Sequence, residues 1–515
     1  MNNDVRDMSD MFTEYGATNI HPVAAVFMLF MIVMVLSSRR SRVILAFLLV
    51  CVFMPMMQRI VVGGLDFNMM RLLLVVAWGR VFVRGEYRGF KPGKLDYLFV
   101  AWTASLAIFH VLRVGPGGIV YRLGTSFDAL TVFFLFRLLV RRREEVLLIA
   151  RELAWIVIVL GGFMAYEMAT RLNVFSIFGS APLISVIRDG KVRCQGPFSH
   201  PILAGTFGAV LVPIFVGVFR GQRKERKLMA VALLFATITT VASGSSGPII
   251  TWGVGVFGWG VWLVRSRTRV IMGSLAGLAF VIHVVRDKPI WHLIGRLASV
   301  TGGTGYHRYL LLEAFITRFG EWALVGTSDT AHWGWGLQDT TNQYVAEGIN
   351  GGLATLVLFV WLLATAFSWL RRTRILIERF EGPKSLWALL VWGFSVSLAA
   401  HCVSFVSVSY FGQMEQFFFL FLALVPALAR FKRRPVQGAR PVPERPALEP
   451  SAARASPNHG DSHQRHLRSE LRGEQRSPRS LLSFPAHPRW ILRELHIAKI
   501  LWAAPQLTLK RRLNL

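Results

Sequence analysis

The stretch Arg193–Gly205, which reads RCQGPFSHPILAG, opens one of the most apolar runs in the chain. Its Gly196–Pro197 pair predicts a turn, and the proline that follows the histidine suits the first turn of a helix. We expect Ser199 or the loop before it to cap this helix. A capped turn explains neither the arginine nor the histidine. Arg193 and His200 are therefore candidate functional residues, because ionisable groups near membrane depth are usually functional.

Composition places this stretch in a membrane protein. The chain has 515 residues, of which 53% are hydrophobic and 17% are charged. A soluble domain carries about a quarter charged residues, and a membrane-crossing helix needs about 20 apolar residues. Apolar runs near that length recur from His21 to Ala429. We predict an all-α, polytopic transmembrane helix bundle with about 12 to 13 spans. Their expected centres lie near residues 29, 52, 76, 104, 131, 156, 210, 235, 256, 277, 360, 396 and 422.

The distribution of positive charge predicts the topology. The formal net charge is +29, but no basic and aromatic residues interleave as in proteins that stack nucleic-acid bases. Basic clusters such as RRSR, GQRKERK and RRTR instead occupy alternate gaps between the apolar runs. Cytoplasmic loops of membrane proteins collect lysine and arginine. We therefore place the basic gaps in the cytoplasm and the other gaps outside, and we expect no nucleic-acid partner.

The same pattern divides the chain into regions. We predict an outward N-terminal segment over residues 1–20, N-terminal transmembrane helices over 21–169, and a core over 170–430 that carries outward loops at 170–199 and 286–350. The proline- and arginine-rich remainder, 431–515, is predicted to be a disordered, basic cytoplasmic tail. The outward loops contain several cations, so their surface is expected to attract anions.

A polar strip precedes the apolar run centred near residue 360. From Leu337 it reads LQDTTNQYVAEGINGG, with a carboxylate and two amides at the expected outer mouth of the span. Capping of the helix by Asp339 or Thr340 would account for one or two of these residues but not for all of them.

The stretch from Gly303, GTGYHRYLLLEAFITRFGEWALVGT, predicts an amphipathic helix over the outer face of the bundle. Arg308 lies on its polar margin. Its apolar stripe, at helical spacing, comprises Leu310, Leu311, Ala314, Phe315 and Phe319.

Together these three stretches resemble the O-antigen ligase/polymerase superfamily, integral membrane enzymes of surface-polysaccharide assembly. That family has an arginine followed by a glycine, an aromatic residue and a His/Asn–Pro pair at the start of a span, and Arg193 takes the arginine's place. Arg308 and the turn to Gly326 look like the family's arginine-led helix in a long outward loop. Asp339, Asn342 and Tyr344 match its D-x-H-N-x-(Y/F) element. The resemblance covers about residues 140 to 430.

The resemblance implies a glycosyl donor carried on a polyprenyl diphosphate and an acceptor glycan or glycolipid. The reaction would take place on the outer side of a bacterial cytoplasmic membrane, with other polysaccharide-assembly proteins as further partners. An arginine fork suits the diphosphate, and nothing in the sequence argues for a metal or a cofactor. The predicted catalytic residues are Arg193, Asp339 and His200, and the predicted substrate-binding residues are Arg308, Asn342, Tyr344, Thr341 and His307.

The chain departs from the family pattern at two positions. Thr341 stands where the ligases carry a histidine, and Ser246 stands where they often carry an arginine. We therefore order the candidates for the base that accepts the acceptor's proton as Asp339, then His200, then His307. Two alternatives stay open. A transporter of lipid-linked saccharide would typically show internal repeats, which we do not find. A catalytically degenerate component of an assembly complex would tolerate both departures.

Overall fold

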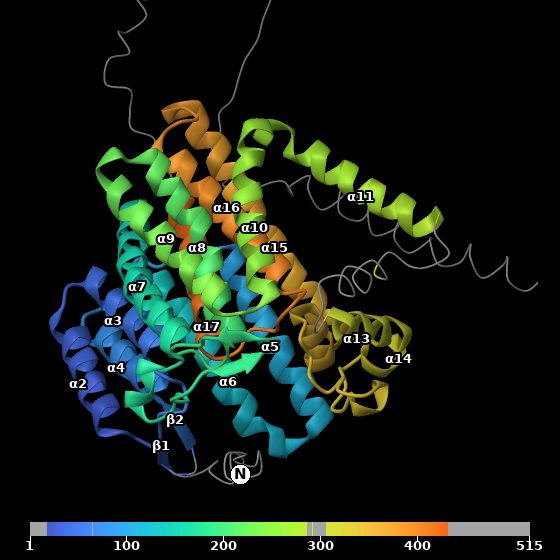
Figure 1. Cartoon of the computed structure of the whole chain (residues 1–515), viewed down its shortest axis with the longest axis horizontal. Helices are drawn as coiled ribbons and strands as arrows, with labels where there is room; N and C mark the ends of the chain where they lie inside the picture. The colour runs from blue at the N-terminus through green and yellow to red at the C-terminus, as the bar shows by residue number, and fades with distance from the viewer. Residues whose placement is uncertain (1–17, 64, 286–290, 292–304, 431–515) are drawn as a thin grey trace, which may run out of the picture. The chain divides into compact units, whose positions relative to one another are not determined.

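The computed structural model describes residues 18–63, 65–285, 291 and 305–430. The predicted tail lies outside these residues, as does almost all of the predicted N-terminal segment. Within the described ranges the chain is helical apart from two short antiparallel ribbons, which confirms the all-α prediction (Figure 1).

The helices follow the predicted apolar runs, and each expected centre falls within a helix. In chain order the longer helices are α2 (Pro22–Ser37), α3 (Arg40–Phe53), α4 (Met69–Val83), α5 (Lys94–Val114), α6 (Ile119–Leu139), α7 (Arg143–Thr170), α8 (Pro201–Gly221), α9 (Arg226–Ala242), α10 (Ser246–Gly260), α11 (Thr268–Val285), α13 (Gly305–Thr317), α15 (Gln343–Glu381), α16 (Leu386–Ser404) and α17 (Gly412–Leu428).

The number of spans is lower than predicted when length and composition are both required. Among the described residues, seven helices are long and apolar enough to cross a membrane, and four further apolar helices have only 10–17 residues. The chain is therefore a multi-pass membrane protein, with seven spans supported in place of the predicted 12 to 13. Helices α2, α3 and α17 are among the elements that fall short in length.

Helix α8 lies at the centre of the bundle and packs against α7, α9, α10, α16 and α17. In its most apolar stretch 89% of the residues are buried inside the protein. Glycines make this possible. A Cβ atom at Gly208 would lie 2.6 Å from the Ala236 carbonyl oxygen of α9. A Cβ at Gly217 would lie 2.8 Å from the Leu389 carbonyl oxygen of α16. Small residues allow membrane helices to approach this closely.

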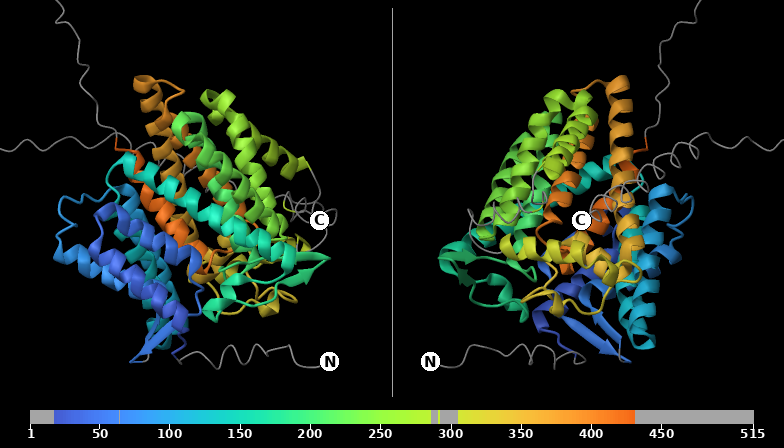
Figure 2. Two further views of the ribbon diagram at one scale, coloured as in Figure 1. Left: turned by 60° about the vertical axis from the view of Figure 1, so that its left-hand side comes forward. Right: turned by 90° about the vertical axis from the view of Figure 1, so that its right-hand side faces the viewer.

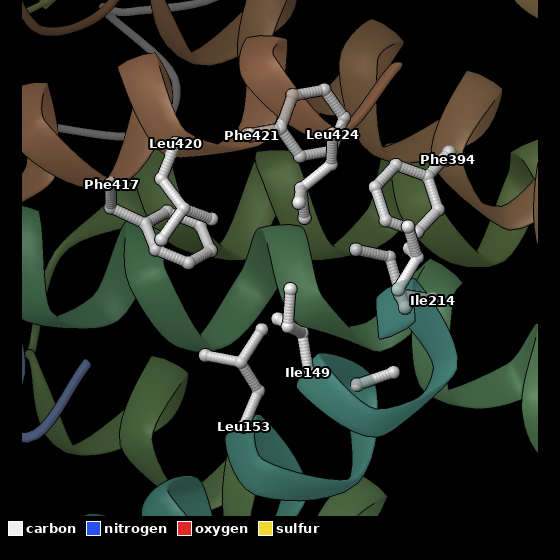
Figure 3. A pocket seen from close by; sticks show the side chains of 10 residues that line it. Ile149, Leu153, Ile214, Phe394, Phe417, Leu420, Phe421 and Leu424 are labelled. Carbon is white, nitrogen blue, oxygen red and sulfur yellow. The ribbon is translucent and has the colours of Figure 1, made fainter. Parts of the chain in front are cut away.

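Apolar side chains fill the space between α7, α8, α16 and α17, where a small cavity remains (Figure 3). Its lining residues are Val146, Ile149, Ala150, Leu153, Ile214, Phe394, Phe417, Leu420, Phe421 and Leu424. None of them is polar, so this cavity belongs to the packed core and offers nothing to hold a charged substrate.

The basic gaps of the sequence gather at one end of the bundle, here called the basic end. Ion pairs connect residues that are far apart in the chain: Arg40 with Glu145 at 2.8 Å, and Arg143 with Glu381 at 2.8 Å. Arg265, in the short 3-10 helix η4 (Val261–Arg267) that follows α10, pairs in the same way with Glu378 of α15, at 2.8 Å. The alternation seen in the sequence therefore corresponds to a real separation of loops in space.

The opposite end, here called the loop end, carries both ribbons and residues 305–342 (Figure 2). One ribbon pairs β1 (Arg59–Val62) with β2 (Leu65–Asn68), and the other pairs β3 (Val186–Arg188) with β4 (Lys191–Arg193). Neither ribbon was predicted, because strands of three or four residues are too short to show a clear alternation of side chains.

One ion pair at the basic end is almost completely buried. Arg137 on α6 donates from Nε and Nη2 to the two carboxylate oxygens of Asp96 on α5, at 2.6 and 2.8 Å. The two side chains are 2% and 1% exposed. Asp96 also accepts a hydrogen bond from the Gly93 N–H at 2.7 Å, which caps α5.

We expect Arg137→Ala to destabilise the protein by about 3–5 kcal/mol, because it leaves the Asp96 carboxylate buried without its cation. Thermal unfolding of the detergent-solubilised protein, followed by tryptophan fluorescence, measures the effect. Arg318→Ala is the matched control, since the Arg318–Glu321 pair is 37% and 38% exposed and such pairs contribute little. Equal unfolding temperatures for the two variants would contradict the prediction.

Candidate functional site

The Arg193 segment begins with β4, the second strand of the β3–β4 ribbon. The two-residue turn at its tip consists of Asp189 and Gly190, with φ angles of 52° and 73°. Positive φ at both positions is typical of the tight turns that join antiparallel strands. Behind the ribbon, the Cys194 N–H donates to the Ala242 carbonyl oxygen at 3.0 Å and ties the segment to the end of α9.

Glu167, in the last turn of α7, holds the chain just after Arg193. Its carboxylate accepts hydrogen bonds from the backbone N–H groups of Gln195 and Gly196 at 3.0 and 2.9 Å. It also accepts one from the Ser185 hydroxyl at 2.6 Å. Asn173 adds a bond to the Gly196 carbonyl oxygen at 2.8 Å. The predicted Gly196–Pro197 turn is thus held from below by a buried carboxylate, which sequence reasoning did not find.

Gln413, at the start of α17, holds the other side of the turn. Its Nε2 donates to the Pro197 carbonyl oxygen at 2.7 Å, and its Oε1 accepts from the Ser199 hydroxyl at 3.2 Å. The side chain is buried. Because side chains of α7 and α17 both form hydrogen bonds with the turn, the packing of the bundle determines its position.

The Arg193 side chain reaches the turn between α9 and α10, where its Nη2 donates to the Ser245 hydroxyl at 3.0 Å. Ser245 immediately precedes Ser246, the position where the ligases often carry an arginine, and Ser246 itself is exposed. Burial, followed by the positive charge of Arg188, lowers the pKa of Arg193. Arg193 makes no ion pair within the described residues.

His200 caps α8, which corrects the expectation that Ser199 or the loop before it would do so. Its Nδ1 accepts a hydrogen bond from the Ile202 N–H at 3.2 Å. A neutral imidazole that accepts at Nδ1 carries its proton on Nε2. Burial is the main cause that lowers the pKa of His200, the charge of Arg193 lowers it further, and the charge of Asp339 raises it. His200 therefore presents a donor to the site, which disfavours it as the base.

Residues 305–342 form a cap at the loop end, and this cap shares a small apolar core with the first turns of α15. This core contains Leu311, Ala314, Phe315, Trp322, Trp333, Leu337, Val345 and Ile349. The amphipathic helix predicted here is α13, and most of its predicted stripe packs into this core. Phe319 is the exception: it begins the short helix α14 (Phe319–Trp322) and is 47% exposed.

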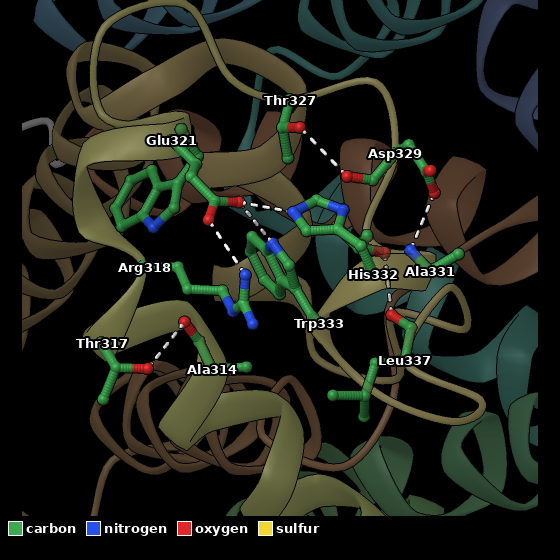
Figure 4. A network of polar contacts seen from close by, with 12 residues as sticks. Ala314, Thr317, Arg318, Glu321, Thr327, Asp329, Ala331, His332, Trp333 and Leu337 are labelled. Carbon is green, nitrogen blue, oxygen red and sulfur yellow. Dashed lines mark hydrogen bonds and ion pairs between the residues drawn. The ribbon is translucent and has the colours of Figure 1, made fainter.

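Glu321 organises the polar side of the cap (Figure 4). Its carboxylate binds Arg318 at 3.1 Å, and both His332 and Trp333 at 2.8 Å. The hydrogen bonds from Trp333 and then His332 lower the pKa of Glu321. These bonds join residues 318–333 to one carboxylate, so the network shapes the loop.

Arg308 lies on α13 and is half-buried, and its Nε is buried without a hydrogen-bond partner among the described residues. Burial and then the charge of Arg188 lower its pKa. The adjacent His307 uses its Nε2 to contact the Gly336 carbonyl oxygen at 2.9 Å. Because a carbonyl oxygen only accepts, His307 Nε2 carries a proton there.

The polar strip before α15 is a loop, and Asn342 is its capping residue. The Asn342 side-chain oxygen accepts from the Tyr344 and Val345 N–H groups at 2.9 and 3.2 Å. The expected caps, Asp339 and Thr340, do not perform this role. Asp339 is exposed beside the site, while the Thr341 hydroxyl is buried with no partner among the described residues.

Tyr344 turns into the bundle. Its hydroxyl donates to the Cys402 carbonyl oxygen at 3.0 Å, and its ring packs edge-on against Phe359 and Phe405. The Asn342 amide group likewise donates, at 3.4 Å, to the Val406 carbonyl oxygen. Both residues of the family-like element therefore have partners within the protein.

Helix α15 is broken about two turns further in, at Gly351 and Gly352, where Gly352 has a φ of 69°. The break leaves the Ile349 carbonyl oxygen without its helical donor. It accepts instead from the Thr327 N–H at 2.9 Å and from Arg113 Nη1 at 2.6 Å. Hydrogen bonds from outside the helix are what allow a break within a membrane-crossing segment.

Sequence reasoning also missed a charged cluster beneath the cap. Arg122 on α6 lies within electrostatic range of Glu347 on α15 and Glu415 on α17. Glu347 is held by the Trp102 indole and the Gln343 amide, both at 2.8 Å. In the sequence Arg122 appeared only as an irregularity in the charge pattern of an outward gap, because residues on three helices meet here through tertiary packing.

Three predicted site residues thus come together at the loop end, namely Arg193, His200 and Asp339, and Arg308 is connected to them through Arg188. Beyond the effect of burial, the charge of Arg193 lowers the pKa of His200 and the charge of Asp339 raises it. The charge of Arg188 likewise adds to burial in lowering the pKa of both Arg193 and Arg308. Within the described ranges no group of three or more histidine, cysteine, aspartate or glutamate side chains is arranged to hold a metal ion. The cations of this site are arginines, which suit phosphate oxygens.

Neither models of known protein families nor curated protein sequences match this chain.

Proposed function

We propose that this protein is a glycosyltransferase that polymerises or ligates polyprenyl-diphosphate-linked saccharide units at the outer face of a bacterial cytoplasmic membrane. The observation that carries the proposal is that Arg193 and Arg308 both lie within electrostatic range of a further arginine, Arg188. They come from separate segments of the chain, and neither has a carboxylate partner among the described residues. Partly buried guanidinium groups without counter-ions favour an anionic ligand, and a diphosphate offers oxygens that match their forks.

In the proposed reaction an acceptor hydroxyl attacks the anomeric carbon of the donor sugar. A new carbon–oxygen glycosidic bond forms as the bond from that carbon to the diphosphate breaks. Arg193 and Arg308 stabilise the negative charge that develops on the departing lipid diphosphate. The hydroxyl proton passes to the carboxylate of Asp339, which is exposed beside His200. His200 Nε2–H donates a hydrogen bond to the substrate.

An open, apolar groove on the surface of the bundle supports a lipid-linked donor. It has a volume of about 520 Å³ and lies between α7 and α9. Its lining is Ile158, Val159, Gly162, Phe163, Tyr166, Val174 and Phe235. Tyr166 immediately precedes Glu167, the residue that holds the Arg193 segment. An apolar chain lying in this groove would have its polar end near the site.

A carrier of lipid-linked saccharide is the second candidate. The charged cluster of Arg122, Glu347 and Glu415 favours it, because ionisable groups inside a helix bundle often mark a transport pathway. The two functions differ in what a cell accumulates when the protein fails. Loss of a carrier leaves lipid-linked units on the inner leaflet, whereas loss of the transferase leaves unpolymerised units on the outer leaflet.

The site faces outward if the basic end is cytoplasmic. Reporter fusions after Arg42, Lys94, Lys227 and Arg372 are expected to report the cytoplasm, and fusions near Asp189 and Asp329 the outer side. Alkaline phosphatase and green fluorescent protein provide complementary signals. A cytoplasmic signal at Asp329 would overturn the proposed location of the site.

Replacing Arg193 tests phosphate recognition. We expect Arg193→Ala and Arg193→Lys each to lower polymer formation at least about 100-fold, because lysine keeps the charge but lacks the planar fork. Polymer and lipid-linked saccharide are quantified in cells with matched protein abundance. Normal polymer formation by Arg193→Lys would show that a point charge is sufficient and that the fork is not needed.

Replacing Asp339 tests the proton acceptor. Asp339→Asn preserves the shape of the side chain and removes the basic carboxylate, so we expect loss of polymer by about 100-fold or more with normal protein abundance. Thr341→Ala is the neighbouring control and is expected to retain most activity, since a hydroxyl does not titrate near neutral pH. An active Asp339→Asn combined with an inactive Thr341→Ala would reverse the two assignments.

A further inference from the structure

We infer that Arg188 is a third cation of this site and that it selects a diphosphate over a monophosphate. The inference rests on the proposed function, in which Arg193 and Arg308 bind the diphosphate of the donor. It adds a specificity-determining residue from the tip of the β3–β4 ribbon, a residue that the sequence did not single out for the site.

The register of the ribbon places Arg188 on the face that carries Arg193. In the antiparallel pairing, Arg188 lies opposite Lys191, and Val186 lies opposite Arg193. Directly opposed residues point to the same face of a ribbon, and residues two apart on one strand share that face. One face therefore carries Arg188, Lys191 and Arg193. The other carries Val192, which packs on the core of the bundle.

Arg188 lies within electrostatic range of the site and has little acid to neutralise it. It acts electrostatically on Arg193, on Arg308 and on His200, whereas Lys191 does so on none of them. Its acidic partner within the described residues is Asp189, at 3.8 Å, where the two side chains are 48% and 79% exposed. An ion pair this exposed contributes little interaction energy, so Asp189 does not prevent Arg188 from binding a ligand.

Three cations on separate supports match two linked phosphates better than one. Arg193 and Arg308 are partly buried, one in the ribbon and one in the cap, and Arg193 can bind the first phosphate group. Arg188, at the end of the ribbon, can then reach the second phosphate. A monophosphate has no second phosphate group for Arg188 to bind. Loss of Arg188 should therefore weaken the binding of a diphosphate more than the binding of a monophosphate.

Binding of inorganic pyrophosphate and of orthophosphate to the full chain in detergent, measured by calorimetry at low salt, tests the inference. We expect Arg188→Ala to weaken pyrophosphate binding about tenfold and orthophosphate binding by less than about threefold, the size expected for one charge-assisted hydrogen bond. Arg188→Lys should retain most of the preference. Lys191→Ala removes the same charge from the same face of the ribbon and should leave the ratio of the two affinities unchanged. Unfolding temperatures confirm that each variant is folded.

The outcomes separate the inference from the function beneath it. If Arg193→Ala abolishes pyrophosphate binding but Arg188→Ala leaves the ratio of affinities unchanged, Arg188 is not selective and the inference alone fails. It fails equally if Lys191→Ala lowers the ratio as much as Arg188→Ala, which would indicate a general positive surface. If the unaltered protein does not bind pyrophosphate, or Arg193→Ala binds it normally, the proposed function fails as well.

Discussion

The close packing of α8 is the constraint on which the rest of the structure depends. Gly208 and Gly217 bring its backbone against carbonyl oxygens of α9 and α16, so any larger side chain there would force the helices apart. The direction of α8 fixes its first turn, and the Arg193 segment leads directly into that turn. A packing requirement in the middle of the bundle therefore determines where the cations of the site can lie at its end.

The loop before α8 is held by polar groups that the bundle buries. Glu167 accepts from two backbone N–H groups, and Gln413 donates to one carbonyl oxygen and accepts from Ser199. Buried polar groups are costly unless they are hydrogen-bonded, so these contacts stabilise one conformation of the loop over its alternatives. A fixed loop is what a phosphate-binding arginine needs, because its fork gains specificity only when its orientation is set before the ligand arrives.

The cap and the bundle meet at the break in α15. The Ile349 carbonyl oxygen, released by the break, is shared between the cap and α5 through Thr327 and Arg113. The first turns of α15 thus belong to the core of the cap as well as to the helix, since Val345 and Ile349 pack with Phe315 and Trp322. This joint places Arg308 and Asp339, which come from the cap, beside groups that come from the bundle.

The sequence by itself determined the apolar runs, and with them the positions of the helices, because an apolar stretch of sufficient length has few other stable structures. It also determined that the basic gaps share one end, and it identified Arg193, His200, Arg308 and Asp339 as candidates. Only the tertiary structure decided which residues cap α8 and α15, because a cap depends on backbone angles and on the reach of one side chain. Likewise, only the tertiary structure brought Glu167, Gln413 and Arg188 to the site, since hydrogen bonds and charges act through space between segments whose separation in the sequence carries no signal.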